Sequence, residues 1–206
     1  MPTPLEDQPI TVVKVGGSLF DWPELPARLE AFLQQDETER QRVVLVAGGG
    51  PFADAVRTIG AVHGLGEREC HRLALRAMDV SAVLLASLLS RSIVVEDFAL
   101  AADAWQSGRR PILAPRRYME DVDEHRDDAL PSSWETTSDS IAARVADRLG
   151  ASRLVVLKSS VAAAVDRMEA ARLGLVDPIF PEASRRISRV DLVAFRQHRW
   201  RTSRLA

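Results

Sequence analysis

The sequence is poor in two residue types, and each scarcity limits its chemistry. It holds one cysteine, Cys70, so no disulfide can form within the chain. Neither Cys70 nor the adjacent His71 stands at metal-ligand spacing, and we expect Cys70 to be structural. Only Lys14 and Lys158 among the 27 basic residues are lysines. Chance is one explanation of their positions. The other is that the chemistry at these two positions prefers a compact ammonium group to a planar guanidinium.

Other missing features exclude whole classes of function. The 27 basic residues are matched by 29 acidic ones, and the net charge of -2 provides no basic surplus for a nucleic acid backbone. No apolar run approaches the thickness of a bilayer, and residues 1–9 lack the basic and apolar parts of a leader. We therefore expect a cytoplasmic protein that acts on small molecules, with no nucleic acid or membrane partner.

The remaining composition is that of a globular protein, with 46% hydrophobic and 27% charged residues, and we expect one domain over residues 1–206. β-Branched apolar runs alternate with longer amphipathic segments, a pattern that predicts an α/β fold. Expected strands lie at 10–15, 42–47, 92–96, 110–114 and 152–157. Expected helices begin near 21–23, 52, 67, 100 and 138, and the third is long and apolar enough for a contact between subunits. Ligands of such folds bind at the carboxyl ends of the strands.

Three segments lack a clear hydrophobic periodicity. Residues 35–40 are polar and should end the first helix. Residues 116–131 are dense in acids and are expected to form a solvated loop or flap, since such runs are more often hydrated surface than metal sites. The tail after Gly174 is expected to be irregular, with a possible strand near 189–195.

The first strand ends in a motif suited to an anion. Lys14 is followed by Gly16, Gly17 and Ser18, and a helix begins soon afterwards. Two glycines at a strand end let the backbone approach a phosphate, and a lysine can neutralise the charge of a transferring phosphoryl group. A plain turn with a surface lysine is the alternative.

The next strand ends in a similar motif. Gly48, Gly49 and Gly50 precede Pro51, and three successive glycines are entropically costly for an ordinary turn. Two such turns at neighbouring strand ends can hold two phosphates, or a phosphate and an acceptor. Neither turn matches the dinucleotide fingerprint or the P-loop.

A third group of polar residues stands at the start of a predicted helix. It comprises Trp134, Thr137, Ser138, Asp139 and Ser140. Helix capping explains one or two of these side chains. The functional alternative for Asp139 is to hold in position the catalytic lysine, and with it an ammonium-bearing site or a Mg²⁺.

These motifs, together with the Leu157-Lys158-Ser159 strand end, occur in an order that resembles the amino acid kinase superfamily over roughly residues 11–160. The Thr-Ser-Asp-Ser run and the Leu-Lys-Ser strand end are similar to the uridylate kinase branch. The short chain and the Leu-Pro-Ser-Ser-Trp-Glu-Thr-Thr-Ser-Asp-Ser-Ile-Ala segment look more like the (aminomethyl)furanmethanol phosphate kinases of methanofuran biosynthesis, which we prefer.

The resemblance implies a three-layer αβα sandwich and transfer of the ATP γ-phosphoryl group, with Mg²⁺, to a small phosphorylated or carboxylated acceptor. It implies that Lys14 holds the transferring phosphoryl group and that Asp139 organises the lysines. Lys158 would contact the nucleotide phosphates, or simply close a strand. N–H donors would come from four glycines, Gly16, Gly17, Gly48 and Gly49. The predicted phosphate and substrate site also includes Ser18, Gly50, Trp134, Thr137 and Ser138, and no metal ligand is assigned.

The C-terminal part departs from the family pattern. Residues 161–166 replace the Val-Asp-Gly-Val type of turn, and no later Gly-Gly-Met segment follows. We therefore expect the acceptor and phosphoryl site within 10–150 and a reduced nucleotide-binding part in 151–206. The alternatives are a non-catalytic module that binds phosphate or nucleotide on the same fold, and a uridylate kinase-like nucleotide kinase. Self-association, common in the family, is also expected.

Overall fold

The apolar, β-branched runs form one central sheet. The structure is a computed structural model that describes residues 8–35, 42–161 and 164–206. Within these residues the sheet has seven strands in the order β3-β4-β2-β1-β5-β6-β7. Their bounds are β1 Ile10–Val15, β2 Arg42–Ala47, β3 Ser92–Val95, β4 Arg110–Leu113, β5 Arg153–Lys158, β6 Arg189–Ala194 and β7 Arg201–Leu205.

All neighbouring strands pair in parallel except β6 and β7, which are antiparallel. In the centre, Lys14 of β1 is level with Val46 of β2 and with Val156 of β5. The carboxyl ends of these three strands therefore meet at one edge of the sheet, as the alternation of strands and helices predicts.

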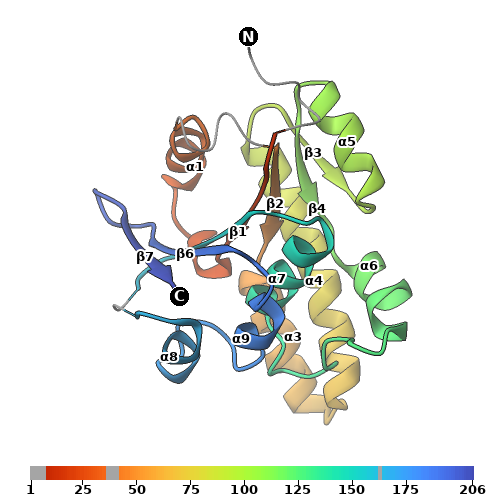
Figure 1. Cartoon of the computed structure of the whole chain (residues 1–206). Coiled ribbons are helices and arrows are strands. Elements are labelled where there is room, and N and C mark those ends of the chain that lie inside the picture. Colours follow the sequence, from red (N-terminus) through yellow and green to blue (C-terminus); the bar gives the residue numbers. More distant parts are fainter. Residues whose placement is uncertain (1–7, 36–41, 162–163) are drawn as a thin grey trace.

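Helices cover both faces of the sheet, which makes the predicted three-layer αβα arrangement (Figure 1). Figure 1 shows α1 on one side of the sheet and α7, α8 and α9 on the other, while α3 and α4 pack side by side. The helices and short 3-10 turns are η2 Gly17–Leu19, α1 Leu25–Leu33, α3 Gly50–His63, α4 Glu67–Leu88, α5 Ala99–Gln106, α6 Arg116–Asp121, η3 Asp123–His125, α7 Ser138–Arg148, α8 Arg167–Arg172 and α9 Phe180–Ser184.

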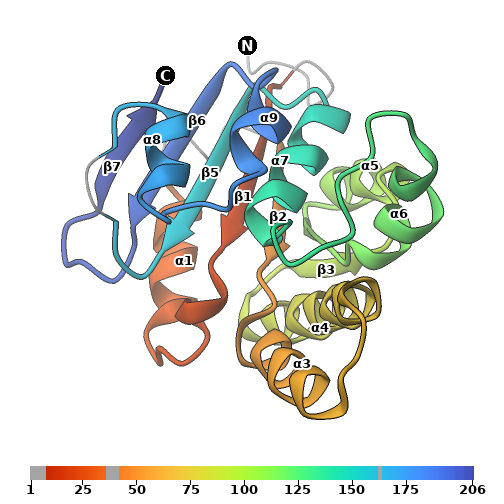
Figure 2. The same cartoon turned by 90° about the horizontal axis from the view of Figure 1, so that it is seen from below.

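The two-residue period of the strands decides which face each side chain enters. Val12 and Val156 belong to the apolar cluster under α7, whereas Val13 and Val155 belong to the cluster under α1. Lys14 and Lys158 lie two residues beyond Val12 and Val156, so both lysines point to the α7 face. In the view of Figure 2 the strands lie side by side, with α3 and α4 together beyond the end of β2.

The acidic segment 116–131 was expected to be a solvated loop or flap, and this is wrong in part. It contains α6 and η3, and Tyr118, Met119 and Asp123 are buried. The acids are used in ion pairs, for example Asp123 with Arg144 at 3.1 Å. Composition alone does not distinguish a charged residue that has a buried partner from one that is hydrated.

The tail after Gly174 is also more regular than expected. It forms α9 and β6, and the chain returns as β7, which pairs antiparallel with β6. β7 is short and mostly exposed, so it lacks the apolar alternation by which strands are recognised. The expected polar segment 35–40 lies largely outside the described residues. None of the helices in the described part of the chain is long and apolar enough to cross a membrane.

Candidate functional site

Two ammonium groups and one carboxylate meet where β1 and β5 end. Lys14 Nζ lies 2.8 Å from Asp139 Oδ1, and Lys158 Nζ lies 2.5 Å from Asp139 Oδ2. The side chains of Lys14 and Asp139 are each 4% exposed, whereas that of Lys158 is 22% exposed. The cluster thus carries one net positive charge, with Lys158 on its solvent side.

The positions of the three residues follow from local structure. Lys14 and Lys158 end neighbouring parallel strands, and Asp139 is in the first turn of α7, which packs across β1. Thr137 is the N-cap of α7, and its side-chain oxygen accepts from the N–H of Asp139 at 3.3 Å. This cap leaves the Asp139 carboxylate free to bind both lysines.

Burial and mutual charge shift the pKa values of this cluster. Burial lowers the pKa of Lys14 below its usual value, and the nearby Lys158 acts in the same direction, against the opposing effect of Asp139. Burial alone would raise the pKa of Asp139, but the charges of Lys14 and Lys158 hold it below its usual value. Asp139 is therefore an anion at neutral pH, and it keeps a buried ammonium group in place.

The two glycine turns pack against each other. A Cβ atom on Gly17 would lie 2.4 Å from the backbone N of Gly50, and one on Gly48 would lie 2.8 Å from the N of Gly17. Gly50 has a φ of 53°, a conformation that side chains disfavour. The close contact between the ends of β1 and β2 therefore requires glycine at these positions.

Not every glycine amide is free to meet an anion. The N–H of Gly16 donates to Leu157 O at 2.9 Å, and the N–H of Gly48 donates to Val15 O at 2.9 Å. Both amides serve the sheet and were expected to serve a phosphate. Among the described residues, no acceptor is found for the N–H groups of Gly17 and Gly49. These two amides are among the donors that the turns can offer.

A pocket of about 300 Å³ opens beside these turns. It is bounded by α3, α4 and the segment that leads into α7. Seven of the predicted residues line it, namely Gly17, Ser18, Gly49, Gly50, Trp134, Thr137 and Ser138. The other predicted residues do not line the pocket, namely Lys14, Gly16, Gly48, Asp139 and Lys158. The pocket has the size and the mixed lining of a site for a small metabolite.

The walls of this pocket differ in character. The Arg57 guanidinium lies over the ring of Trp134 at 4.6 Å and also pairs with Asp54 at 3.1 Å. In contrast, α4 and α7 contribute apolar side chains, among them Leu75, Met78 and Ile141. His71 of α4 lines the pocket as well, although the sequence pattern did not mark it as a site residue.

Asp177 is a second residue that the sequence did not reveal. Its Oδ2 accepts from the N–H of Thr137 at 3.0 Å, from Thr137 Oγ1 at 2.6 Å and from the N–H of Ser140 at 3.1 Å. Its Oδ1 accepts from Ser140 Oγ and from the N–H groups of Ile179 and Phe180. Asp177 is buried and thus joins the start of α7 to the start of α9. It lies 38 residues after Asp139 in sequence, with no motif to connect them.

We expect the Asp177→Asn variant to lower kcat about tenfold and the free energy of unfolding by about 2 kcal/mol. Asparagine replaces one acceptor oxygen by a donor, so bonds to Thr137 or Ser140 are lost and the start of α7 no longer holds Asp139 firmly. Steady-state kinetics and urea unfolding measure the two effects.

The matched control is Asp97→Asn, because Asp97 Oδ1 accepts from the N–H of Ala99 at the start of α5, away from the cluster. This variant should lose some stability because the hydrogen bond to Ala99 is weakened, and it should keep its kcat. Equal losses of kcat in Asp97→Asn and Asp177→Asn would show that Asp177 acts only on stability.

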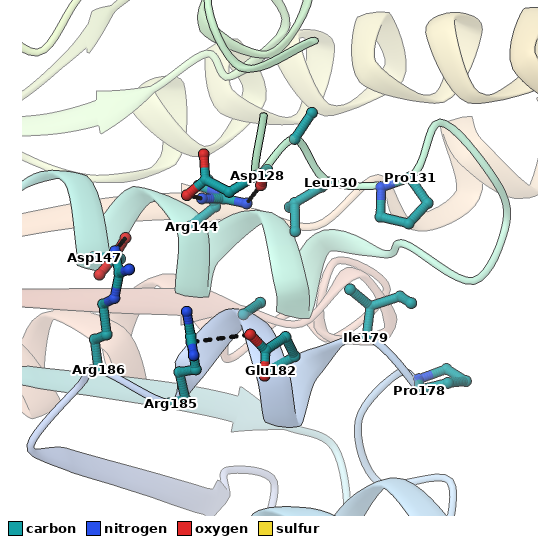
Figure 3. Close-up of a pocket in the computed structure, with 12 residues that line it drawn as sticks. Asp128, Leu130, Pro131, Arg144, Asp147, Pro178, Ile179, Glu182, Arg185 and Arg186 are labelled. Carbon is teal, nitrogen blue, oxygen red and sulfur yellow. Dashed lines mark hydrogen bonds and ion pairs between the residues drawn. The ribbon is translucent and has the colours of Figure 1, made fainter. Parts of the chain in front are cut away.

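A second cavity, of about 350 Å³, lies between α7, α9 and the loop before α7 (Figure 3). Its charged side chains pair with one another: Arg185 lies 2.9 Å from Glu182, and Arg144 lies 3.0 Å from Asp128. Neither lysine and none of the glycine turns lines it. Although it is slightly larger than the pocket beside the glycine turns, it lacks the turns in which a phosphate is predicted to bind.

Residues 9–161 match the amino acid kinase family. A [5-(aminomethyl)furan-3-yl]methyl phosphate kinase from Methanocaldococcus jannaschii is 27% identical over 165 residues, which are 79% of this chain and 71% of that relative.

Solved structures show the same fold at low identity. A uridylate kinase from Archaeoglobus fulgidus superposes with a TM-score of 0.60 at 19% identity, over 87% of this chain and 88% of the other. A UMP kinase from Ureaplasma parvum gives 0.66 at 12% identity, over 100% and 99%. An aspartate kinase from Synechocystis gives 0.70 at 15% identity, over 96% of this chain and 39% of the other.

Proposed function

The chain belongs to the amino acid kinase family, and we propose that it transfers the γ-phosphoryl group of ATP to the phosphate of a small phosphorylated metabolite. The cluster of Lys14, Asp139 and Lys158 beside the two glycine turns carries this proposal. It gathers positive charge where negative charge would be transferred, within a site largely closed to water.

The chemistry needs no covalent intermediate with the protein. An oxygen of the acceptor phosphate forms a bond to the γ-phosphorus, the bond from that phosphorus to the β-γ bridging oxygen breaks, and ADP leaves. Lys14 would stabilise charge on the transferring group, and the N–H groups of Gly17 and Gly49 would orient it. Lys158, on the more exposed side of the cluster, would contact the nucleotide phosphates.

The residues present fit ATP that carries its own Mg²⁺. No group of three or more His, Cys, Asp or Glu side chains that could hold a metal ion occurs in the described part of the chain. Mg²⁺ in kinases is held largely by nucleotide phosphates, waters and one or two carboxylates, so such a protein cage is not required. When bound, the ion would neutralise phosphate charge.

The acceptor that we propose is [5-(aminomethyl)furan-3-yl]methyl phosphate, the compound in the name of the M. jannaschii relative. The glycine turns would receive its phosphate, and the apolar wall of Leu75, Met78 and Ile141 would contact its flat ring. The reaction would then be a step of methanofuran biosynthesis in the cytoplasm.

Two further features belong to this proposal. Residues 151–206 would contribute the nucleotide-binding part of a single domain. The protein would also form a homo-oligomer through α3 and α4, which expose apolar side chains at Ile59, Val62, Val80 and Val83, the second of them 76% exposed.

The direct test is ADP release from ATP and Mg²⁺ with three candidate acceptors. We expect turnover with [5-(aminomethyl)furan-3-yl]methyl phosphate, and kcat/KM at least about a hundredfold lower with UMP, which lacks the ammonium group and is much larger. Phosphoserine serves as a small phosphorylated control. Preference for UMP would favour a uridylate kinase-like activity. Stabilisation by ATP in a thermal shift assay without ADP release from any acceptor would favour a non-catalytic module.

A further inference from the structure

His71 is a buried polar side chain that the phosphoryl chemistry does not use. It is 6% exposed, and it lies on the face of α4 that lines the acceptor pocket, together with Leu75 and Met78. These three residues are spaced four and three apart, so they form one stripe along the helix. His71 is thus the polar end of an otherwise apolar wall.

The hydrogen bond of His71 identifies its tautomer. Its Nδ1 lies 3.0 Å from the carbonyl oxygen of Ser133, which can only accept, so Nδ1 carries the proton. Burial lowers the pKa of His71 below its usual value, and the ring is therefore neutral near pH 7. Its Nε2 is left as an acceptor, for which no donor is found among the described residues.

The position of His71 along α4 places it far from the glycine turns. Ser81 Oγ, on the same helix, donates to Gly49 O at 3.2 Å and so marks the phosphate end of the pocket. His71 is ten residues earlier, about 15 Å along the helix axis. An acceptor whose phosphate lies at Gly49 would therefore approach His71 with its opposite end.

The charges around His71 favour a cation over a neutral hydroxyl group. The carboxylates of Glu67 and Glu124 both raise the pKa of the His71 ring, against the larger effect of burial. Arg68 and Arg72 bind Glu124, whereas Glu67 Oε1 accepts from the N–H of Trp134 at 3.0 Å, and no ion pair of Glu67 is found among the described residues. The negative electrostatic potential of these carboxylates would stabilise a positive group beside Nε2.

We propose that His71 Nε2 accepts a hydrogen bond from a primary ammonium group at the end of the acceptor that lies away from its phosphate. This makes His71 a specificity-determining residue, and it rests on the proposed phosphorylation of a phosphorylated amine. Selectivity follows because an acceptor without the amine leaves Nε2 without this hydrogen bond inside the pocket.

The test compares two acceptors and three variants. The acceptors are [5-(aminomethyl)furan-3-yl]methyl phosphate and its analogue with a methyl in place of the aminomethyl group. The variants are His71→Leu, His71→Gln and the control His125→Leu, since His125 is exposed and does not line the pocket. Binding of each acceptor is measured by calorimetry without ATP, so it does not depend on turnover.

We expect His71→Leu to weaken binding of the amine about 10- to 100-fold, the loss of a hydrogen bond to a charged group, and to leave binding of the methyl analogue unchanged. His71→Gln, which keeps an acceptor oxygen, should recover part of the loss, and His125→Leu should match the wild type. An equal loss for both acceptors in His71→Leu would overturn the proposal, because it would show a merely structural role.

Failure of this inference can be told from failure of the proposed function. If the wild type binds the amine no more tightly than the methyl analogue, yet phosphorylates both, His71 does not recognise an ammonium group. The kinase assignment then still stands. If the wild type binds neither acceptor, the acceptor class itself is wrong and the inference falls with it.

Discussion

Replacement of Lys14 by methionine is expected to lower kcat about a hundred- to a thousandfold while the fold stays intact. The substitution removes the buried ammonium group that would stabilise charge on the transferring phosphoryl group, and losses of this size follow the removal of one such group from other active sites. Asp139 retains Lys158 as its partner, so no carboxylate is left buried without a cation. ADP release under saturating ATP measures the effect, and circular dichroism monitors the fold.

A second variant at this position separates charge from shape. Lys14→Arg keeps the positive charge but introduces a larger, planar group into a side-chain position that is 4% exposed. We expect this variant to be nearly as inactive as Lys14→Met, because a guanidinium cannot reproduce the compact ammonium contact with Asp139. Full activity of Lys14→Met would show that Lys14 takes no part in catalysis. Full activity of Lys14→Arg would show that Lys14 contributes only its charge.

Asp139→Asn should have the largest effect on stability, a loss of about 3 kcal/mol or more. The variant leaves Lys14 buried beside Lys158 without the carboxylate that the two lysines share. Because burial already lowers the pKa of Lys14, the loss of Asp139 should lower it further. The unfolded chain would then bind protons more tightly than the folded one, so the stability of the variant should rise as the pH increases towards the usual lysine pKa.

Urea unfolding at several pH values measures this loss. The matched control is Asp147→Asn, on the same helix, whose carboxylate lies 3.8 Å from its partner Arg186. That control should cost at most about 1 kcal/mol, as expected for a long ion pair near the surface. A loss in Asp139→Asn no greater than in Asp147→Asn would mean that the two lysines do not need their shared carboxylate.

The central strands and most helices were predictable because their signal is local. The β1, β2 and β5 strands are continuous β-branched or leucine-rich runs, and all three are found where the pattern predicts them. The family and the kinase activity were predictable for another reason: the Lys14, Gly48 and Asp139 motifs stand in a characteristic order. By contrast, β7 escaped prediction because it is an exposed strand whose identity depends on pairing with β6.

Within the site, the sequence was informative about residue types and less so about their tasks. It indicated that Gly16 and Gly48 belong to the phosphate turns, but the tertiary structure uses their amides to bind neighbouring strands. Asp177 and His71 were missed because their significance lies in contacts with Thr137, Ser140 and Ser133, which are distant in sequence. No spacing rule connects such residues.

By itself, then, the sequence determined the central strands of the sheet, the order of the motifs and the scarcity of lysine that directs attention to Lys14 and Lys158. Only the tertiary structure decided that both lysines share Asp139, that Asp177 holds the start of α7, and which amides remain free. The physical reason is that hydrophobic periodicity and glycine turns act over a few neighbouring residues. Hydrogen bonds and ion pairs between strand ends and helix starts depend instead on how the layers pack.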